Sequence, residues 1–156
     1  MKKIIILIPI YNDWQSLEKL IFEINKNINE ISNTIFKLLI VNDASTTNQP
    51  KLKKPQNIES INILNMKQNR GHARCNAFGI RYALKNENFD HLILMDGDGE
   101  DRPEEIKSLL NSIYVNPNTS VVAKRVKRSE GFFFQFLYSL HKILTQLFTG
   151  KKIHFG

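Results

Sequence analysis

The feature that most constrains the fold is an alternation of short apolar runs with longer amphipathic stretches. The apolar runs, rich in β-branched residues, predict five strands: Lys3–Pro9, Phe36–Val41, Ser60–Leu64, His91–Met95 and Ser120–Ala123. Helical spacing of apolar residues, and a proline suited to a first helical turn, predict three helices: Trp14–Asn29, His72–Lys85 and Pro103 to about Tyr114. Such alternation is typical of an α/β protein with a mostly parallel sheet and helices on both faces.

Composition narrows the class of protein further. The chain has 156 residues, 42% of them hydrophobic, which excludes a disordered chain and fits one globular domain. A single cysteine excludes a disulfide framework and a cysteine-based zinc site. The apolar run after Lys3 is cut by Pro9, so no signal peptide is predicted, and no run is long enough for a membrane-spanning helix. We therefore expect a cytoplasmic chain.

The net charge of +7 is concentrated near the C-terminus. From Val121 onward there are seven basic residues and one acid, whereas the first 120 residues are nearly neutral. We therefore divide the chain into an α/β part, 1–123, and a basic segment, 124–156. Apolar residues at helical spacing in the basic segment predict an amphipathic helix. This helix either packs on the sheet or lies on a membrane surface. Nucleic acid is not expected as a partner, because Phe132–Phe134 belong to an aliphatic stripe rather than a stacking groove.

The sharpest local signal is the acidic sequence that follows the fourth predicted strand. Asp96, Asp98, Glu100 and Asp101 crowd four carboxylates together, with glycines at 97 and 99. Clustered like charges repel, so this pattern indicates a bound divalent cation whose shell substrate phosphates complete. An acidic turn that caps the next helix is the alternative. An EF-hand loop is excluded by spacing, since its glycine and final glutamate positions hold Asp101 and Lys107.

Other polar residues follow the remaining predicted strands. Tyr11 comes after the first strand and Asp43 after the second, where a ring and a carboxylate suit the face and edge of a nucleotide base. Equally, Tyr11 suits a rim aromatic and Asp43 a turn residue. His72 opens a predicted helix, a place suited either to a phosphate or to a capping side chain. Ligands of parallel sheets bind beyond the carboxyl ends of the strands, so these residues should share one edge.

Together, the order and spacing of these motifs resemble the family 2 glycosyltransferases of the GT-A fold. The similarity is greatest to the dolichyl- or polyprenyl-phosphate sugar synthases. It extends over nearly the whole chain. The matching residues are Pro9, Tyr11 and Asn12; Asn42-Asp43-Ala44-Ser45; Asn69-Arg70-Gly71-His72 with Gly79; Asp96-Gly97-Asp98; Pro103-Glu104; and Arg125. Two departures are the Asn42 that replaces the first acid of its motif and a chain shorter than family members usually are. The short chain is interpreted as a truncated form or a minimal donor-binding domain.

The resemblance implies roles for individual residues. Pro9 and Tyr11 would line the donor site, and Tyr11 and Asp43 would hold the base. Asp96 would face the ribose and diphosphate. Asp98 would bind Mg²⁺ or Mn²⁺, with Asp96 and Glu100 as further ligands. Arg125, with Arg128, would hold phosphate of the donor or acceptor, which makes Asp98 and Arg125 the predicted catalytic residues.

The resemblance also implies an activity. The chain is predicted to transfer a sugar from a nucleoside-diphosphate sugar to a polyprenyl phosphate, with inversion and with metal dependence. Transfer to a saccharide hydroxyl and a catalytically incomplete nucleotide-sugar-binding module are the alternatives. A lipid acceptor would place the chain peripherally on the inner face of the cell membrane.

Overall fold

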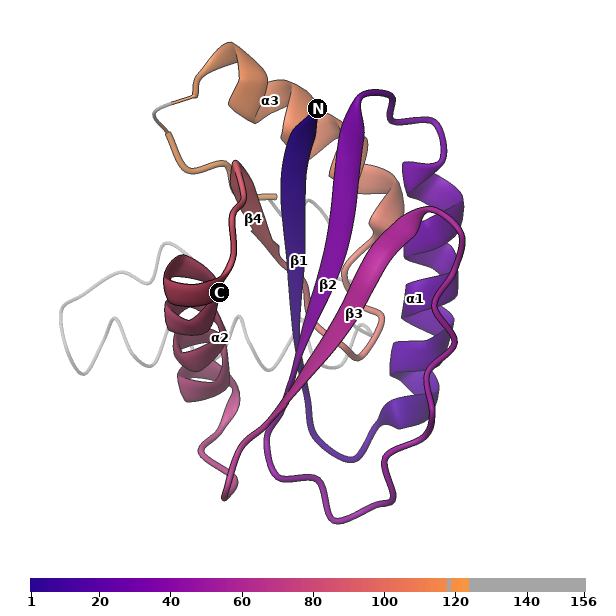
Figure 1. The fold of residues 1–156 in the computed structure, drawn as a ribbon, viewed down its shortest axis with the longest axis vertical. Coiled ribbons are helices and arrows are strands. Elements are labelled where there is room, and N and C mark those ends of the chain that lie inside the picture. The colour runs from indigo at the N-terminus through magenta and orange to yellow at the C-terminus, as the bar shows by residue number, and fades with distance from the viewer. Residues whose placement is uncertain (118, 124–156) are drawn as a thin grey trace, which may run out of the picture. The chain divides into compact units, whose positions relative to one another are not determined.

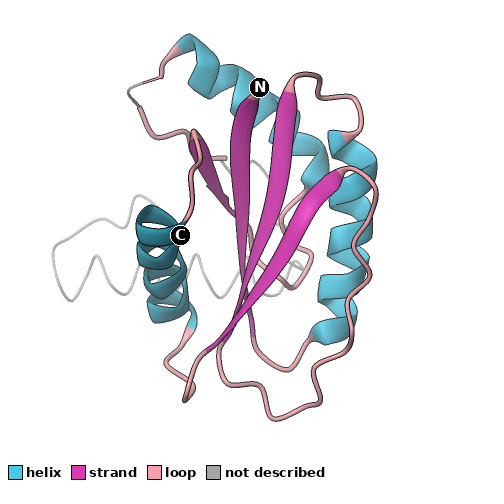
Figure 2. Cartoon of the chain, in the orientation of Figure 1, coloured by secondary structure: helices cyan, strands magenta, loops and turns pink. Residues whose placement is uncertain are grey.

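The computed structural model describes residues 1–117 and 119–123. Residues Met1–Val121 form one compact α/β unit (Figures 1 and 2). Its elements in chain order are β1 (Lys2–Ile10), α1 (Trp14–Ile28), β2 (Thr34–Asn42), β3 (Ile58–Asn65), α2 (His72–Asn86), β4 (His91–Leu94), the short 3-10 helix η1 (Pro103–Glu105) and α3 (Ile106–Val115).

The four strands form one sheet in the order β3-β2-β1-β4. Every pairing is parallel, and Ile6 in β1 lies opposite Leu38 in β2 and Ile93 in β4. A central parallel strand is buried on both faces, and this explains why β1 is a continuous apolar run rather than an alternating one. The α/β class with a parallel sheet is therefore confirmed.

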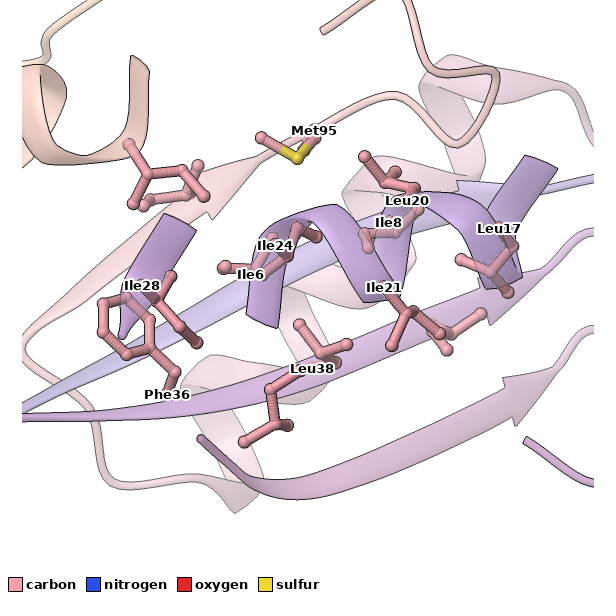
Figure 3. Close-up of a cluster of buried hydrophobic side chains, with 14 of the residues drawn as sticks. Ile6, Ile8, Leu17, Leu20, Ile21, Ile24, Ile28, Phe36, Leu38 and Met95 are labelled. Carbon is pink, nitrogen blue, oxygen red and sulfur yellow. The ribbon is translucent and has the colours of Figure 1, made fainter. Parts of the chain in front are cut away.

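One face of the sheet is covered by α1 together with η1 and α3 (Figure 1). Asp13 begins α1, because its side chain accepts a hydrogen bond from the backbone N–H of Ser16 at 3.1 Å. The apolar stripe of α1 then packs on Ile6 and Ile8 of β1 (Figure 3). The buried residues of the stripe are Trp14, Leu17, Leu20, Ile21, Ile24 and Ile28.

The opposite face is covered by α2 (Figure 1). Cys75 and Ala83 are fully buried here with Leu7, because alternate residues of β1 point to this second face. The helix lies so close to the sheet that a Cβ on Gly79 would overlap Leu7 and come within 2.8 Å of Val41. The glycine thus sets the distance between α2 and the sheet.

The structure corrects one expected strand and adjusts several boundaries. Residues Ser120–Ala123 are described without strand structure, so the fifth strand was predicted wrongly. The helix expected from Pro103 is split into η1 and α3. Within residues 1–117 and 119–123, no helix is sufficiently long and apolar to cross a bilayer. The predicted C-terminal amphipathic helix and the segment 124–156 lie outside the described residues.

Candidate functional site

A pocket of about 240 Å³ opens at the carboxyl ends of β1 and β4. Its walls come from the end of β1, the β1–α1 connection, the start of α2 and the loop after β4. The lining residues are Pro9, Ile10, Tyr11, Asp13, His72, Asp96, Gly97 and Asp98. This volume is below the roughly 300–1,000 Å³ of pockets that enclose a drug-sized ligand.

The loop after β4 places two carboxylates in the pocket. The backbone of Gly97 runs so close to β1 that an added Cβ would lie 2.8 Å from the carbonyl oxygen of Pro9. Gly99 has a φ of +83°, in the left-handed region that favours glycine. Asp101 does not face the pocket: its side chain accepts the backbone N–H of Asp96 at 2.8 Å and closes the loop. The two glycines and Asp101 therefore give the loop a shape in which Asp96 and Asp98 line the pocket.

Charge is concentrated around Asp96. Burial raises the pKa of its carboxyl above the usual value, His72 opposes this shift, and the nearby carboxylates of Asp101, Asp98 and Glu100 raise the pKa further. His72 Nε2 lies 3.4 Å from an Asp96 oxygen. A carboxylate held among other acids in this way is stabilised by an added cation.

Asp43 is a buried anchor for the loop before α2. The residue is 4% exposed, and its two side-chain oxygens accept the backbone N–H groups of Arg70 and Gly71, each at 2.8 Å. Asp43 is absent from the pocket lining, unlike Tyr11. The geometry therefore gives Asp43 a positioning function at the start of α2, and contact with a base stays a prediction.

Asn12 joins the loops that follow β1 and β2. Its φ is 60°, and its side-chain oxygen accepts the backbone N–H groups of Thr46 at 2.7 Å and Thr47 at 3.1 Å. Its own N–H donates to the Ser45 hydroxyl at 2.9 Å. Asn42 supports the same loop, because its side-chain oxygen accepts the Ser45 N–H at 2.9 Å. These bonds fix the β1–α1 connection that carries Tyr11.

Comparison with known proteins identifies the family. The sequence model of the family described as "Glycosyl transferase family 2" matches residues 5–155. The chain belongs to glycosyltransferase family 2. Its parallel sheet and its pocket at the strand ends agree with this assignment.

Two similar curated proteins carry the same description, "Undecaprenyl-phosphate 4-deoxy-4-formamido-L-arabinose transferase". The protein from Proteus mirabilis (strain HI4320) is 29% identical over 111 residues, which cover 70% of this chain and 33% of that protein. The protein from Salmonella choleraesuis (strain SC-B67) is 27% identical over 154 residues, which cover 97% of this chain and 45% of that protein. The chain thus spans a third to under half of the length of these relatives.

A similar solved structure is that of S. aureus TarS 1-349. The TM-score is 0.53 at 18% sequence identity, and the match covers 81% of this chain and 39% of that one. At this identity the similarity concerns the fold, and it supports the GT-A architecture for this family 2 chain.

Of the predicted family 2 site residues that the structure describes, four line the pocket, and Asp43 and Glu100 do not. Pro9, Tyr11, Asp96 and Asp98 line it, whereas Glu100 does not, although its N–H donates to Asp98 at 2.9 Å. Arg125 and Arg128 lie outside the described residues.

The pocket residues can supply only part of the coordination shell of a metal ion, and a bound substrate would complete it. Among the residues that the structure describes, no three His, Cys, Asp or Glu side chains are grouped as a metal site. Mg²⁺ commonly takes one or two carboxylates and completes its shell with substrate phosphates and water. Asp96 and Asp98, which both line the pocket, fit such a site. A bound cation would neutralise the negative charge of the carboxylates around Asp96.

The sequence predicted no individual function for two residues that line the pocket and for one residue that fixes a loop. Asp13 and Ile10 line the pocket, and Asp13 also caps α1. An acid directly after a strand and before an apolar helix was the available signal for Asp13. The loop-fixing function of Asn12 was not predicted beyond its place in a motif, because its partners Thr46 and Thr47 are more than thirty residues away in the sequence.

Proposed function

We propose that this chain is the donor-binding part of a glycosyltransferase that moves a sugar from a nucleoside-diphosphate sugar to a polyprenyl phosphate. The observation that carries the proposal is one pocket, at the strand ends of a family 2 fold, that combines the Tyr11 ring with the carboxylates of Asp96 and Asp98. The two curated relatives named for undecaprenyl phosphate support a lipid-phosphate acceptor.

Different pocket residues are proposed to contact different parts of the donor. Tyr11 is 47% exposed, so its ring is accessible for packing against a base. Asp96 and Asp98, which also line the pocket, would hold Mg²⁺ or Mn²⁺, which when bound neutralises charge on the departing diphosphate. Asp43 acts indirectly, because it holds the Arg70–Gly71 backbone at the start of α2.

The proposed reaction is a single displacement at the sugar carbon. An oxygen of the acceptor phosphate forms the new bond to this carbon as the bond to the diphosphate breaks. The bonding electrons leave with the nucleoside diphosphate, and the configuration of the sugar carbon inverts. A phosphate oxyanion carries no proton that must be removed, so the site needs no general base. Arg125 and Arg128 are proposed to orient the acceptor phosphate, and such an acceptor places the protein at the inner face of the membrane.

A transfer assay tests the proposal. The chain is incubated with radiolabelled UDP- or GDP-sugars, Mn²⁺ and undecaprenyl phosphate in detergent, and label is measured in the organic phase after extraction. Metal-dependent transfer to lipid is expected, and Asp98→Asn should reduce it while Glu104→Gln, an exposed acid outside the pocket, should not. A parallel reaction contains soluble oligosaccharides in place of the lipid, and label transferred only in that reaction would favour a hydroxyl acceptor. Donor binding with no transfer to any acceptor would favour a nucleotide-sugar-binding module.

A further inference from the structure

The exposed side of α2 carries positive charge without any acid. Arg74, Arg81 and Lys85 recur at helical spacing, and the helix sequence contains no Asp or Glu. All three residues are exposed. They lie opposite the buried stripe of Cys75, Gly79 and Ala83, because residues seven and eleven positions apart return to the same side of a helix. We call the exposed residues Arg74, Phe78, Arg81, Leu84 and Lys85 the α2 basic face.

The cations of this face are not engaged elsewhere in the described structure. Among residues 1–117 and 119–123, the recorded ion pairs involve Lys2, Lys37, His72 and Lys107 as the basic partners, and none involves the α2 basic face. Glu87, just after the helix, is occupied by Lys37 at 3.2 Å. Within the described part of the chain, no acidic side chain neutralises these cations.

Apolar side chains are interspersed with these cations. Phe78 is 43% exposed and Leu84 is 70% exposed. Cations alternating with exposed Phe and Leu on one helix are typical of helices that lie on a lipid surface, where the apolar groups enter the boundary and the cations meet headgroups. A nucleic-acid surface would instead favour aromatic rings in a groove that follows the phosphate backbone.

The helices on the opposite face of the sheet carry charges of both signs. The described helix α1 carries two acids, Glu18 and Glu23, and two lysines, Lys19 and Lys26. On the same side, η1 adds two acids and α3 one lysine. Figure 1 shows α2 on the other side of the sheet from α1 and α3. Among the described helices, α2 is therefore the one that a negatively charged plane attracts most strongly.

We infer that the α2 basic face docks this domain on an anionic lipid bilayer. The donor pocket lies at the N-terminal end of α2, near the first cation of the α2 basic face. His72 lines the pocket and is two residues before Arg74. Docking through α2 would bring the pocket rim beside the lipid headgroups. This placement would present the pocket to a lipid-phosphate acceptor, and that last step alone rests on the proposed function.

Vesicle binding by charge-matched variants tests the inference. Binding to vesicles of phosphatidylcholine, with and without phosphatidylglycerol, is measured by flotation for the whole chain. The α2 variant is Arg74→Gln/Arg81→Gln/Lys85→Gln, and its control is Lys19→Gln/Lys26→Gln/Lys107→Gln on α1 and α3. A cation near an anionic membrane contributes about 1 kcal/mol, or about fivefold in affinity. The α2 variant should thus bind anionic vesicles about 100-fold more weakly, and the control much less so.

Several outcomes would overturn the inference. Equal losses in the two variants would show that net charge, and not the α2 face, governs binding. Unchanged binding in the α2 variant, with a loss only on neutralising the basic residues of 124–156, would assign docking to that segment. Vesicle binding absent in all variants, together with DNA binding that the α2 substitutions weaken, would identify a nucleic-acid surface instead.

Three further measurements make the result interpretable. Phe78→Ser should weaken vesicle binding without changing its dependence on salt, since it removes an apolar contact and no charge. Thermal melts should be unchanged within a few degrees for all of these exposed substitutions. Transfer to an acceptor in detergent should survive in the α2 variant, so a failure of the docking inference and a failure of the proposed function give different results.

Discussion

Asp43→Asn separates a positioning carboxylate from one that only contacts a ligand. Asp43 is 4% exposed, and each of its oxygens accepts a backbone N–H at 2.8 Å. Asparagine keeps one oxygen, so one charge-assisted hydrogen bond is lost, at a cost of about 1.5–3 kcal/mol. The new amide N–H₂ faces the N–H of either Arg70 or Gly71, so these two donors oppose each other and neither has an acceptor.

The expected loss in free energy of unfolding is about 2–3 kcal/mol, measured by urea denaturation followed by circular dichroism. Asp98→Asn is the matched control. Its oxygen accepts the N–H of Glu100 in an exposed loop, so its unfolding free energy should change by about 0.5 kcal/mol or less. If Asp43→Asn left stability unchanged and only weakened nucleotide binding, the anchoring function assigned to Asp43 would be refuted.

Three other substitutions or reactions probe the packing around the site. Gly97→Ala places a Cβ 2.8 Å from the Pro9 carbonyl oxygen, so the acidic loop must shift, and calorimetry should record about tenfold weaker nucleotide binding. Gly79→Ala gains about 1 kcal/mol of helix propensity but forces a methyl group onto Leu7, which costs about 1–3 kcal/mol, so urea denaturation should record a net loss. Burial raises the pKa of the Cys75 thiol to about 11. The thiol should therefore resist Ellman's reagent at pH 8 until urea is added, and the stability it contributes should be lost as pH rises from about 9 through 11.

The sheet was predictable because its central strands carry apolar runs, Ile4–Ile8 in β1 and Leu38–Val41 in β2. β1 is buried on both faces, so its sequence shows no alternation, and this marks a central parallel strand. The run at Ser120–Ala123 has similar composition, yet Val122 is 83% exposed and the segment forms no strand. Strand propensity reflects packing against neighbours, and in the part of the chain that the structure describes this segment has no paired neighbour.

The pocket was predictable in part, because strand ends converge in a parallel sheet. Tyr11, Asp96 and Asp98 were placed together by this rule, and the structure places all three on the pocket wall. The functions of Asp43 and Asn12 were not predictable in the same way. Both act through hydrogen bonds to backbone groups of distant loops, and the sequence does not encode those partners as a pattern.

Donor binding measured by isothermal titration calorimetry is the most direct test of the central claim. The claim is that the pocket lined by Tyr11, Asp96 and Asp98 binds a nucleoside diphosphate together with a divalent ion. UDP and GDP are titrated into the chain with Mn²⁺, with Mg²⁺ and with neither. We predict binding that requires a metal, that Asp98→Asn weakens by about tenfold or more, and that Glu104→Gln leaves unchanged. Equal affinity with and without metal, or equal losses in the two variants, would contradict the account.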